Sequence, residues 1–147
     1  MDEQISNQQA FAEKVVWITG ASGGIGEEMA VAFARAGSKL VLSARNQKKL
    51  ECVRDRCFEA GADHGSMLVL PLDVVDLDAM PGAVNKVMEK YSKIDLLINN
   101  AGVGVRDFCT DIKIDVYRTA LEVNLIGPIA LTKQVLPCLL YTSDAAD

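Results

Sequence analysis

Short apolar runs alternate with amphipathic stretches along most of this chain, and this alternation constrains the fold more than any other feature. Four runs have the length and continuous apolar character of strands buried on both faces, and they cover residues 15–18, 39–43, 67–72 and 94–98. The stretches after them repeat apolar residues at helical spacing, over residues 25–36, 47–60, 76–91 and 114–136. Strand–helix alternation with short connections requires a parallel sheet covered by helices on both faces. We therefore predict an α/β fold with one doubly wound parallel sheet.

Composition and charge exclude several classes of protein. The 147 residues suit one domain, and the net charge of −5 argues against a nucleic-acid partner. The basic run of Arg45, Lys48 and Lys49 is typical of a solvated helix start. The four cysteines show no C-x-x-C pair and no metal-ligand spacing with His64, so we expect reduced thiols and no metal site. No stretch approaches the ~20 apolar residues of a membrane span, so we expect a cytoplasmic protein with no membrane segment in this chain.

A glycine-rich turn, TGASGGIG, lies between the first predicted strand and the first helix. Glycines let the backbone approach a pyrophosphate closely, and the following helix offers free N–H groups to the anion. Since the turn stands in the strand–helix context that such a motif requires, we predict a Rossmann-type unit that binds a nucleotide. The predicted contacts are Gly20, Ser22, Gly24, Ile25 and Gly26, and the alternative is a plain flexible turn.

Four motifs together resemble one family. They are the GASGGIG spacing of the turn, the LDV run at 72–74, the NNAG run at 99–102 and the VNLxG run at 123–127. They occur in the order found in the short-chain dehydrogenase/reductase family, and the likeness spans residues 15–137. Within the family, residues 40–45, 68–73 and 115–118 resemble the dehydrogenase/reductase SDR family member 7 branch, whose members often carry an N-terminal membrane segment.

The end of the second predicted strand indicates which cofactor binds. A site for NAD presents a carboxylate to the ribose 2′-hydroxyl, but residues 39–50 contain no Asp or Glu and place Arg45 directly after the strand. A guanidinium pairs with the 2′-phosphate of NADP(H), so we predict NADP(H) as the cofactor. Ser22 and Ser43 could donate further hydrogen bonds to that phosphate. The alternative is that Arg45 is an ordinary solvated residue.

The family resemblance implies roles for further residues. Asp73 would accept a hydrogen bond from the adenine amino group, with Val74 beside it. The ribose and nicotinamide would be lined by Asn99, Asn100, Ala101 and Gly102, although an asparagine pair also suits plain turn chemistry. Asn124 resembles the catalytic asparagine that holds a water in a proton relay, and its alternative is a structural residue that kinks a helix.

The same resemblance implies a catalytic tyrosine followed four residues later by a lysine, which lowers the pKa of the phenol. None of the three tyrosines fits, because Tyr91, Tyr117 and Tyr141 are followed at that spacing by Asp95, Leu121 and Ala145. We therefore expect the catalytic tyrosine to lie beyond the end of this chain, and the sheet to be incomplete, with its first four strands only.

The predicted boundaries follow from these motifs. Residues 1–13 form a polar extension and residues 14–137 the NADP(H)-binding unit. Residues 138–147 no longer resemble the family but are similar to translated adapter DNA, so we expect a non-native tail; a diverged natural tail is the alternative.

The resemblance also defines the expected function. We expect the parent protein to be an NADP(H)-dependent oxidoreductase acting on a small hydrophobic alcohol or carbonyl compound, and a homo-oligomer when complete. This chain alone is expected to be inactive. The alternatives are a non-catalytic NADP(H)-binding module and a non-functional fragment, because an unpaired apolar fourth strand favours aggregation.

Overall fold

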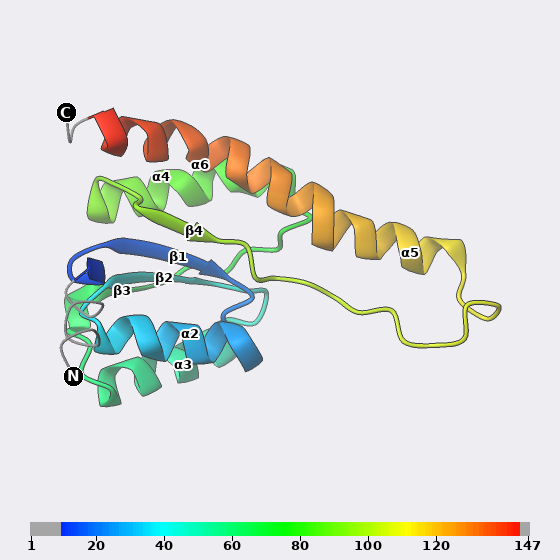
Figure 1. The fold of residues 1–147 in the computed structure, drawn as a ribbon, viewed down its shortest axis with the longest axis horizontal. Coiled ribbons are helices and arrows are strands. Elements are labelled where there is room, and N and C mark those ends of the chain that lie inside the picture. Colours follow the sequence, from blue (N-terminus) through cyan, green and yellow to red (C-terminus); the bar gives the residue numbers. More distant parts are fainter. Residues whose placement is uncertain (1–9, 145–147) are drawn as a thin grey trace.

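The structure, a computed structural model, describes residues 10–144 and contains one four-stranded parallel sheet (Figure 1). The strands follow the order β3-β2-β1-β4 across the sheet. Their bounds are Val15–Thr19 for β1, Lys39–Ser43 for β2, Met67–Val69 for β3 and Leu96–Ile98 for β4. β1 is central and pairs with both β2 and β4. This order confirms the prediction of a Rossmann-type parallel sheet.

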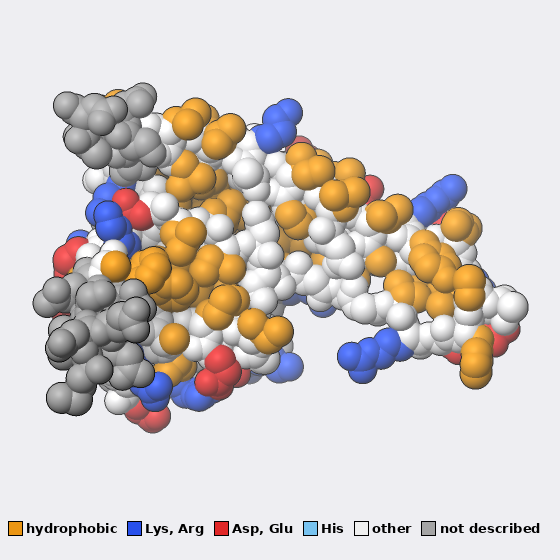
Figure 2. Space-filling model, in the orientation of Figure 1, with side chains coloured by type: hydrophobic (Ala, Val, Ile, Leu, Met, Phe, Trp, Pro, Cys, Tyr) orange, Lys and Arg blue, Asp and Glu red, His pale blue; other side chains and the backbone are white. Residues whose placement is uncertain are grey.

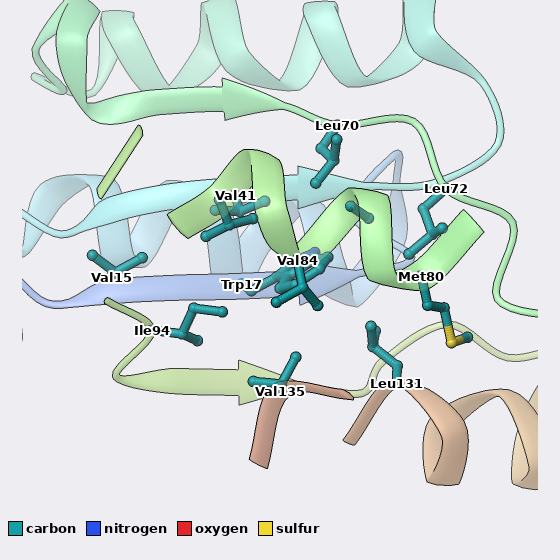
Figure 3. Close-up of a cluster of buried hydrophobic side chains, with 12 residues drawn as sticks. Val15, Trp17, Val41, Leu70, Leu72, Met80, Val84, Ile94, Leu131 and Val135 are labelled. Atoms are coloured by element: carbon teal, nitrogen blue, oxygen red, sulfur yellow. The ribbon is translucent and has the colours of Figure 1, made fainter. Parts of the chain in front are cut away.

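Two pairs of helices cover the two faces of the sheet (Figure 1). One face is covered by α2 (Gly24–Arg35) and α3 (Gln47–Glu59), and the other by α4 (Met80–Tyr91) and α6 (Gly127–Asp144). Because successive side chains of a strand point to opposite faces, β1 contributes to two separate cores. Val16 and Ile18 pack with α2 and α3, whereas Val15 and Trp17 pack with α4 and α6, the cluster drawn in Figure 3.

The third and fourth strands are shorter than the sequence predicts. β3 ends at Val69, although the N–H groups of Leu70 and Leu72 still donate to carbonyls at the end of β2 and just after it, at 2.9 and 3.1 Å. β4 begins only at Leu96, because the Asp95 carboxylate accepts the N–H of Val15 at 2.8 Å, where a strand carbonyl would otherwise be the acceptor. Hydrogen bonds outside the regular strand pairing therefore hold the end of β3 and the start of β4.

The last predicted helix is divided and longer than expected. It consists of α5 (Ile114–Leu121), a π-helical segment η3 (Glu122–Ile126) and α6, which continues to Asp144 with Pro137 inside it. α5 and the loop before it project beyond the sheet in Figure 1. The helix passes through Cys138, where the predicted non-native tail begins, so the origin of the tail stays a prediction.

The α5–α6 segment leaves much of its apolar surface exposed, and Figure 2 shows hydrophobic side chains along it. By length and composition alone, Ile114–Tyr141 could cross a membrane, since it contains an 18-residue window with a mean hydropathy of 1.4. Leu131 and Val135 on this helix are nevertheless fully buried against the sheet. One side of the helix is thus committed to the fold, and the absence of a membrane segment stays a prediction.

The burial of Leu131 gives a test of this packing. Replacing Leu131 with Ala should lower the free energy of unfolding by about 2–5 kcal/mol, because it removes core contacts and leaves a cavity between α6 and the sheet. Ile129→Ala on the same helix is the control, since half of the Ile129 side chain is exposed, and it should cost about 0.5 kcal/mol or less. Urea unfolding measures both, and equal losses would contradict the packing of α6.

The cysteines differ in accessibility, which a labelling experiment can measure. Burial in the core raises the pKa of the Cys57 thiol to about 11, whereas Cys52 and Cys109 are exposed. Because the thiolate is the reactive form, a maleimide at pH 8 should label Cys52 and Cys109 in the folded chain and Cys57 only after unfolding. Peptide mass spectrometry reads out each site, and early labelling of Cys57 would show that α3 is loosely packed.

Candidate cofactor site

An open cavity of about 1050 Å³ lies at the carboxyl edge of the sheet. Parallel α/β sheets bind ligands at this edge, where the strands lead into loops. The lining comes from the glycine-rich turn, the start of α3, the segment after β3, the loop after β4, and the α5–η3 helix. The lining residues are Gly20, Ser22, Gly23, Ile25, Ala44, Arg45, Asn46, Gln47, Lys48, Lys49, Leu72, Asp73, Val74, Asn100, Ala101, Gly102, Val103, Thr119 and Val123.

The cavity therefore brings together most of the predicted binding residues. Those at its wall are Gly20, Ser22, Ile25, Arg45, Asp73, Val74, Asn100, Ala101 and Gly102. Five other predicted residues lie outside the lining, and they are Gly24, Gly26, Ser43, Asn99 and Asn124. Their contacts show what each does in the fold.

The glycines of the turn are required by close packing and by backbone conformation. Gly20 has a φ of 65°, and a Cβ there would lie 2.8 Å from the Cα of Ala101. A Cβ on Gly26 would overlap the carbonyl oxygen of Gly20. Gly24 has a φ of 57° but open space around it, so only its backbone conformation calls for glycine. The turn is held tightly on its inner side and left open on its outer side.

The hydroxyl of Thr19 joins the turn to the loop after β4. This buried oxygen accepts hydrogen bonds from the N–H groups of Asn100 and Ala101, both at 3.1 Å, and donates to the carbonyl of Ile98. The Asn100 carboxamide donates in return to the carbonyls of Thr19 and Gly20, at 3.1 and 3.2 Å. The sequence analysis did not identify Thr19, although a hydroxyl at the end of a buried strand is a usable signal.

Asn124 holds the loop after β4 from the other side. Its carboxamide accepts from the N–H of Val103 and donates to the carbonyl of Val103, both at 2.8 Å. Asn124 lies in the π-helical segment η3, a geometry that often marks functional positions in helices. The structural alternative for this residue thus has direct contacts, and its catalytic role stays a prediction.

Asn99 points away from the cavity. Its Nδ2 donates to the hydroxyl of Thr132 on α6 at 3.0 Å, which ties the end of β4 to the helix that covers it. Of the asparagine pair, Asn100 therefore faces the glycine-rich turn and Asn99 faces α6.

One end of the cavity is strongly cationic. Arg45, Lys48 and Lys49 all line it, and the N-terminus of α3 adds the positive end of a helix dipole. The side chain of Asn46 caps this helix by accepting the N–H of Lys49 at 3.1 Å. The sequence alone predicts the two lysines only as a solvated helix start, because a linear pattern does not reveal which face of α3 borders the cavity.

Ser43 does not lie where the sequence analysis placed it. The residue is buried and absent from the cavity lining, and its hydroxyl oxygen accepts a hydrogen bond of 2.9 Å from Nε1 of Trp17. Strand alternation explains the difference, because the Ser43 side chain points into the core shared with Trp17 and not past the end of β2. Ser22 remains at the cavity wall.

Comparison with known proteins identifies the family. A profile described as short chain dehydrogenase matches residues 14–146. The chain is 45% identical over 128 residues to human "Dehydrogenase/reductase SDR family member 7" and 42% identical over 142 residues to the Anopheles gambiae "Dehydrogenase/reductase SDR family protein 7-like". These alignments cover 86% and 95% of this chain. The chain belongs to the short-chain dehydrogenase/reductase family, and its resemblance to the member 7 branch is confirmed.

Solved structures agree with this assignment. A short-chain dehydrogenase/reductase from Caenorhabditis elegans with cofactor superposes with a TM-score of 0.82 at 34% identity, over 89% of this chain. The glucose dehydrogenase of the same organism in its apo form gives 0.79 at 36% identity, over 88% of this chain. The chain spans 38% and 44% of the two curated relatives and 50% and 51% of the two solved chains.

The tight packing of Gly26 gives a test of the turn. Gly26→Ala should lower the free energy of unfolding by roughly 1–3 kcal/mol, because the added methyl group overlaps the Gly20 carbonyl. Gly82→Ala in α4 is the control, since a Cβ there meets nothing within 4 Å, and it should stabilise the chain by up to about 1 kcal/mol. Thermal unfolding measures both signs, and a neutral Gly26→Ala would show that the turn is not packed as described.

Proposed function

We propose that this chain is the NADP(H)-binding part of an oxidoreductase that interconverts an alcohol and a carbonyl compound. The observation that carries the proposal is the cationic end of the cavity, where Arg45 lies two residues after the end of β2 and Lys48 and Lys49 lie beside it. Family membership supports a nicotinamide cofactor in general. The charge distribution of this cavity supports its phosphorylated form.

The backbone of the glycine-rich turn fits a pyrophosphate. A Cβ at Gly24 would meet nothing within 4 Å, so the outer side of the turn is open to a ligand at the start of α2. Ser22 and Ile25 line the cavity beside it. Free N–H groups at the start of a helix stabilise negative charge. Gly26 serves the inner packing of the turn, and Gly20 serves that packing and also lines the cavity.

Arg45 is suited to a 2′-phosphate because no described carboxylate forms an ion pair with it. Among the described residues its guanidinium forms no ion pair, in contrast to Arg54, Arg56 and Arg118. Asp73 is the one carboxylate among the described lining residues, and it lies on the segment after β3, where it would meet the adenine. Its Oδ1 accepts the N–H of Val75 at 3.2 Å, which fixes the carboxylate in the turn.

The nicotinamide end would lie along the loop after β4. Asn100, Ala101, Gly102 and Val103 line this part of the cavity. When bound, NADP(H) supplies or accepts the hydride of the reaction. We assign to Asn124 the holding of the loop through Val103 and, in the complete protein, the holding of a water in the proton relay.

A second candidate function, NADP(H) binding without catalysis, is favoured by the state of the described tyrosines. The hydroxyl of Tyr91 is buried without a hydrogen-bond partner, and burial raises the pKa of its phenol. The Tyr117 hydroxyl contacts Sγ of Cys109 at 3.6 Å, and that hydrogen bond raises the pKa of Tyr117. Tyr91, Tyr117 and Tyr141 all lie outside the cavity lining, and the raised pKa values of Tyr91 and Tyr117 do not suit a proton donor near neutral pH. In this second proposal, this chain alone binds the cofactor without turning over a substrate.

We extend the family properties to the complete protein as part of the same proposal. Its substrate would be a small hydrophobic alcohol or carbonyl compound, and it would assemble as a homo-oligomer. The exposed apolar surface of α5 and α6 supports assembly, because soluble monomers rarely expose large contiguous apolar patches. A cytoplasmic location stays a prediction.

Exchange of Arg45 tests the choice of cofactor. The chain should bind NADPH more tightly than NADH, and Arg45→Ala should weaken NADPH binding roughly ten- to a hundredfold while leaving NADH binding nearly unchanged, because a charge-assisted pair with the phosphate is lost. Isothermal titration calorimetry measures both dissociation constants.

Arg54→Ala is the matched control for this experiment. Arg54 lies on α3, near Arg45 in the sequence, but it pairs with Asp55 and does not line the cavity, so both affinities should stay as in the unchanged chain. Equal binding of NADPH and NADH by the unchanged chain would refute the proposed specificity. Turnover of a carbonyl compound by this chain would refute the non-catalytic reading.

A further inference from the structure

Ser43 is one of three polar residues buried in the described core, together with Thr19 and Ser38. It accepts the indole N–H of Trp17 at 2.9 Å. The two residues are diagonal neighbours on β1 and β2, since Thr19 lies opposite Ser43 and Trp17 opposite Val41. Trp17 is itself fully buried, so its N–H has no access to water. A buried polar pair of this kind is costly to disturb, because either group left alone loses its partner.

The main chain of Ser43 is tied to the glycine-rich turn. Its carbonyl oxygen accepts the N–H of Ala21 at 3.1 Å. Ser22 comes directly after Ala21, and Arg45 comes two residues after Ser43. Both Ser22 and Arg45 line the cavity. Through its side chain and its carbonyl, Ser43 therefore connects β1, the turn and the segment that carries Arg45.

We infer that the Trp17–Ser43 hydrogen bond sets the position of Arg45 relative to the glycine-rich turn, so that Trp17 and Ser43 act as positioning residues for recognition of the 2′-phosphate. This inference rests on the proposed function, because the phosphate is the ligand concerned. The Arg45 side chain has no described ion pair to hold it, so the main chain at the end of β2 determines where its charge can reach. A recognition group displaced by a fraction of an ångström loses much of its directed pairing.

The chain offers a matched control at the opposite edge of the sheet. Ser38, just before β2, is buried to the same degree as Ser43, and its hydroxyl donates to the carbonyl of Phe11 at 2.8 Å. Ser38→Ala thus also removes a buried hydrogen bond made by a serine next to β2, but at the end of the strand that lies away from the cavity. Any general loss of stability should be shared by both variants, whereas a change in cofactor preference should not.

The experiment measures the ratio of the dissociation constants of NADH and NADPH by calorimetry on the full chain, with thermal unfolding alongside. Ser43→Ala and Trp17→Phe should each lower this ratio about fivefold, because a displaced guanidinium loses part of its charge-assisted pairing with the phosphate. Combining them should lower it no further, because both changes remove the same bond. Ser43→Thr keeps the hydroxyl and should restore the ratio, and Ser38→Ala should leave it unchanged.

Each outcome decides the matter. Unchanged ratios in both Ser43→Ala and Trp17→Phe, or an equal fall in Ser38→Ala, would overturn the inference while leaving the proposed function intact. Equal binding of NADPH and NADH by the unchanged chain would overturn the proposed function, and the inference with it. If Ser43→Ala does not fold, Trp17→Phe gives the answer, since it removes the donor and keeps an aromatic ring, and thermal unfolding measures the packing lost with the smaller ring.

Discussion

The buried central strand β1 supports both the fold and the site. Its residues from Val15 to Thr19 are all at most 1% exposed, and its side chains alternate between the two apolar cores. Thr19 is the last residue of β1 and follows four apolar residues. Its hydroxyl forms the hydrogen bonds that join the turn after β1 to the loop after β4. Because both cores hold β1 in place, the position of the turn that follows β1 is also determined. This turn forms part of the cavity wall.

The two walls of the cavity differ in how they are held. On the side of β4, the loop is fixed by Thr19 at one point and by the carboxamide of Asn124 at Val103. On the side of β2, the cationic end depends on the short segment after Ser43, which is held by main-chain bonds at Ala21 and Leu72. Charge draws an anion to this end, and main-chain geometry decides how well the cations meet it. Under the proposed function, selectivity between two cofactors that differ by one phosphate would depend on both.

The periodicity of the sequence predicted the order and type of the main elements, because buried parallel strands and amphipathic helices have distinct apolar patterns. Boundaries were less accurate where side chains replace main-chain partners, as Asp95 does at the start of β4. The π-helical segment that divides the last helix contains Asn124, for which a helix kink was the structural alternative, but its π-helical geometry had no sequence signal of its own. It accompanies the bonds between Asn124 and Val103, residues 21 positions apart, which no local pattern encodes.

The sequence by itself determined the parallel sheet, the family and most of the residues around the cavity, since these follow from local spacing and from motifs at strand ends. Only the tertiary structure decided which of these residues face the ligand space. It turned Asn99 toward α6 and Ser43 toward Trp17, and it brought Lys48 and Lys49 beside Arg45. The physical reason is that a side chain's direction depends on strand alternation and helix packing, and both are set by contacts between segments far apart in the chain.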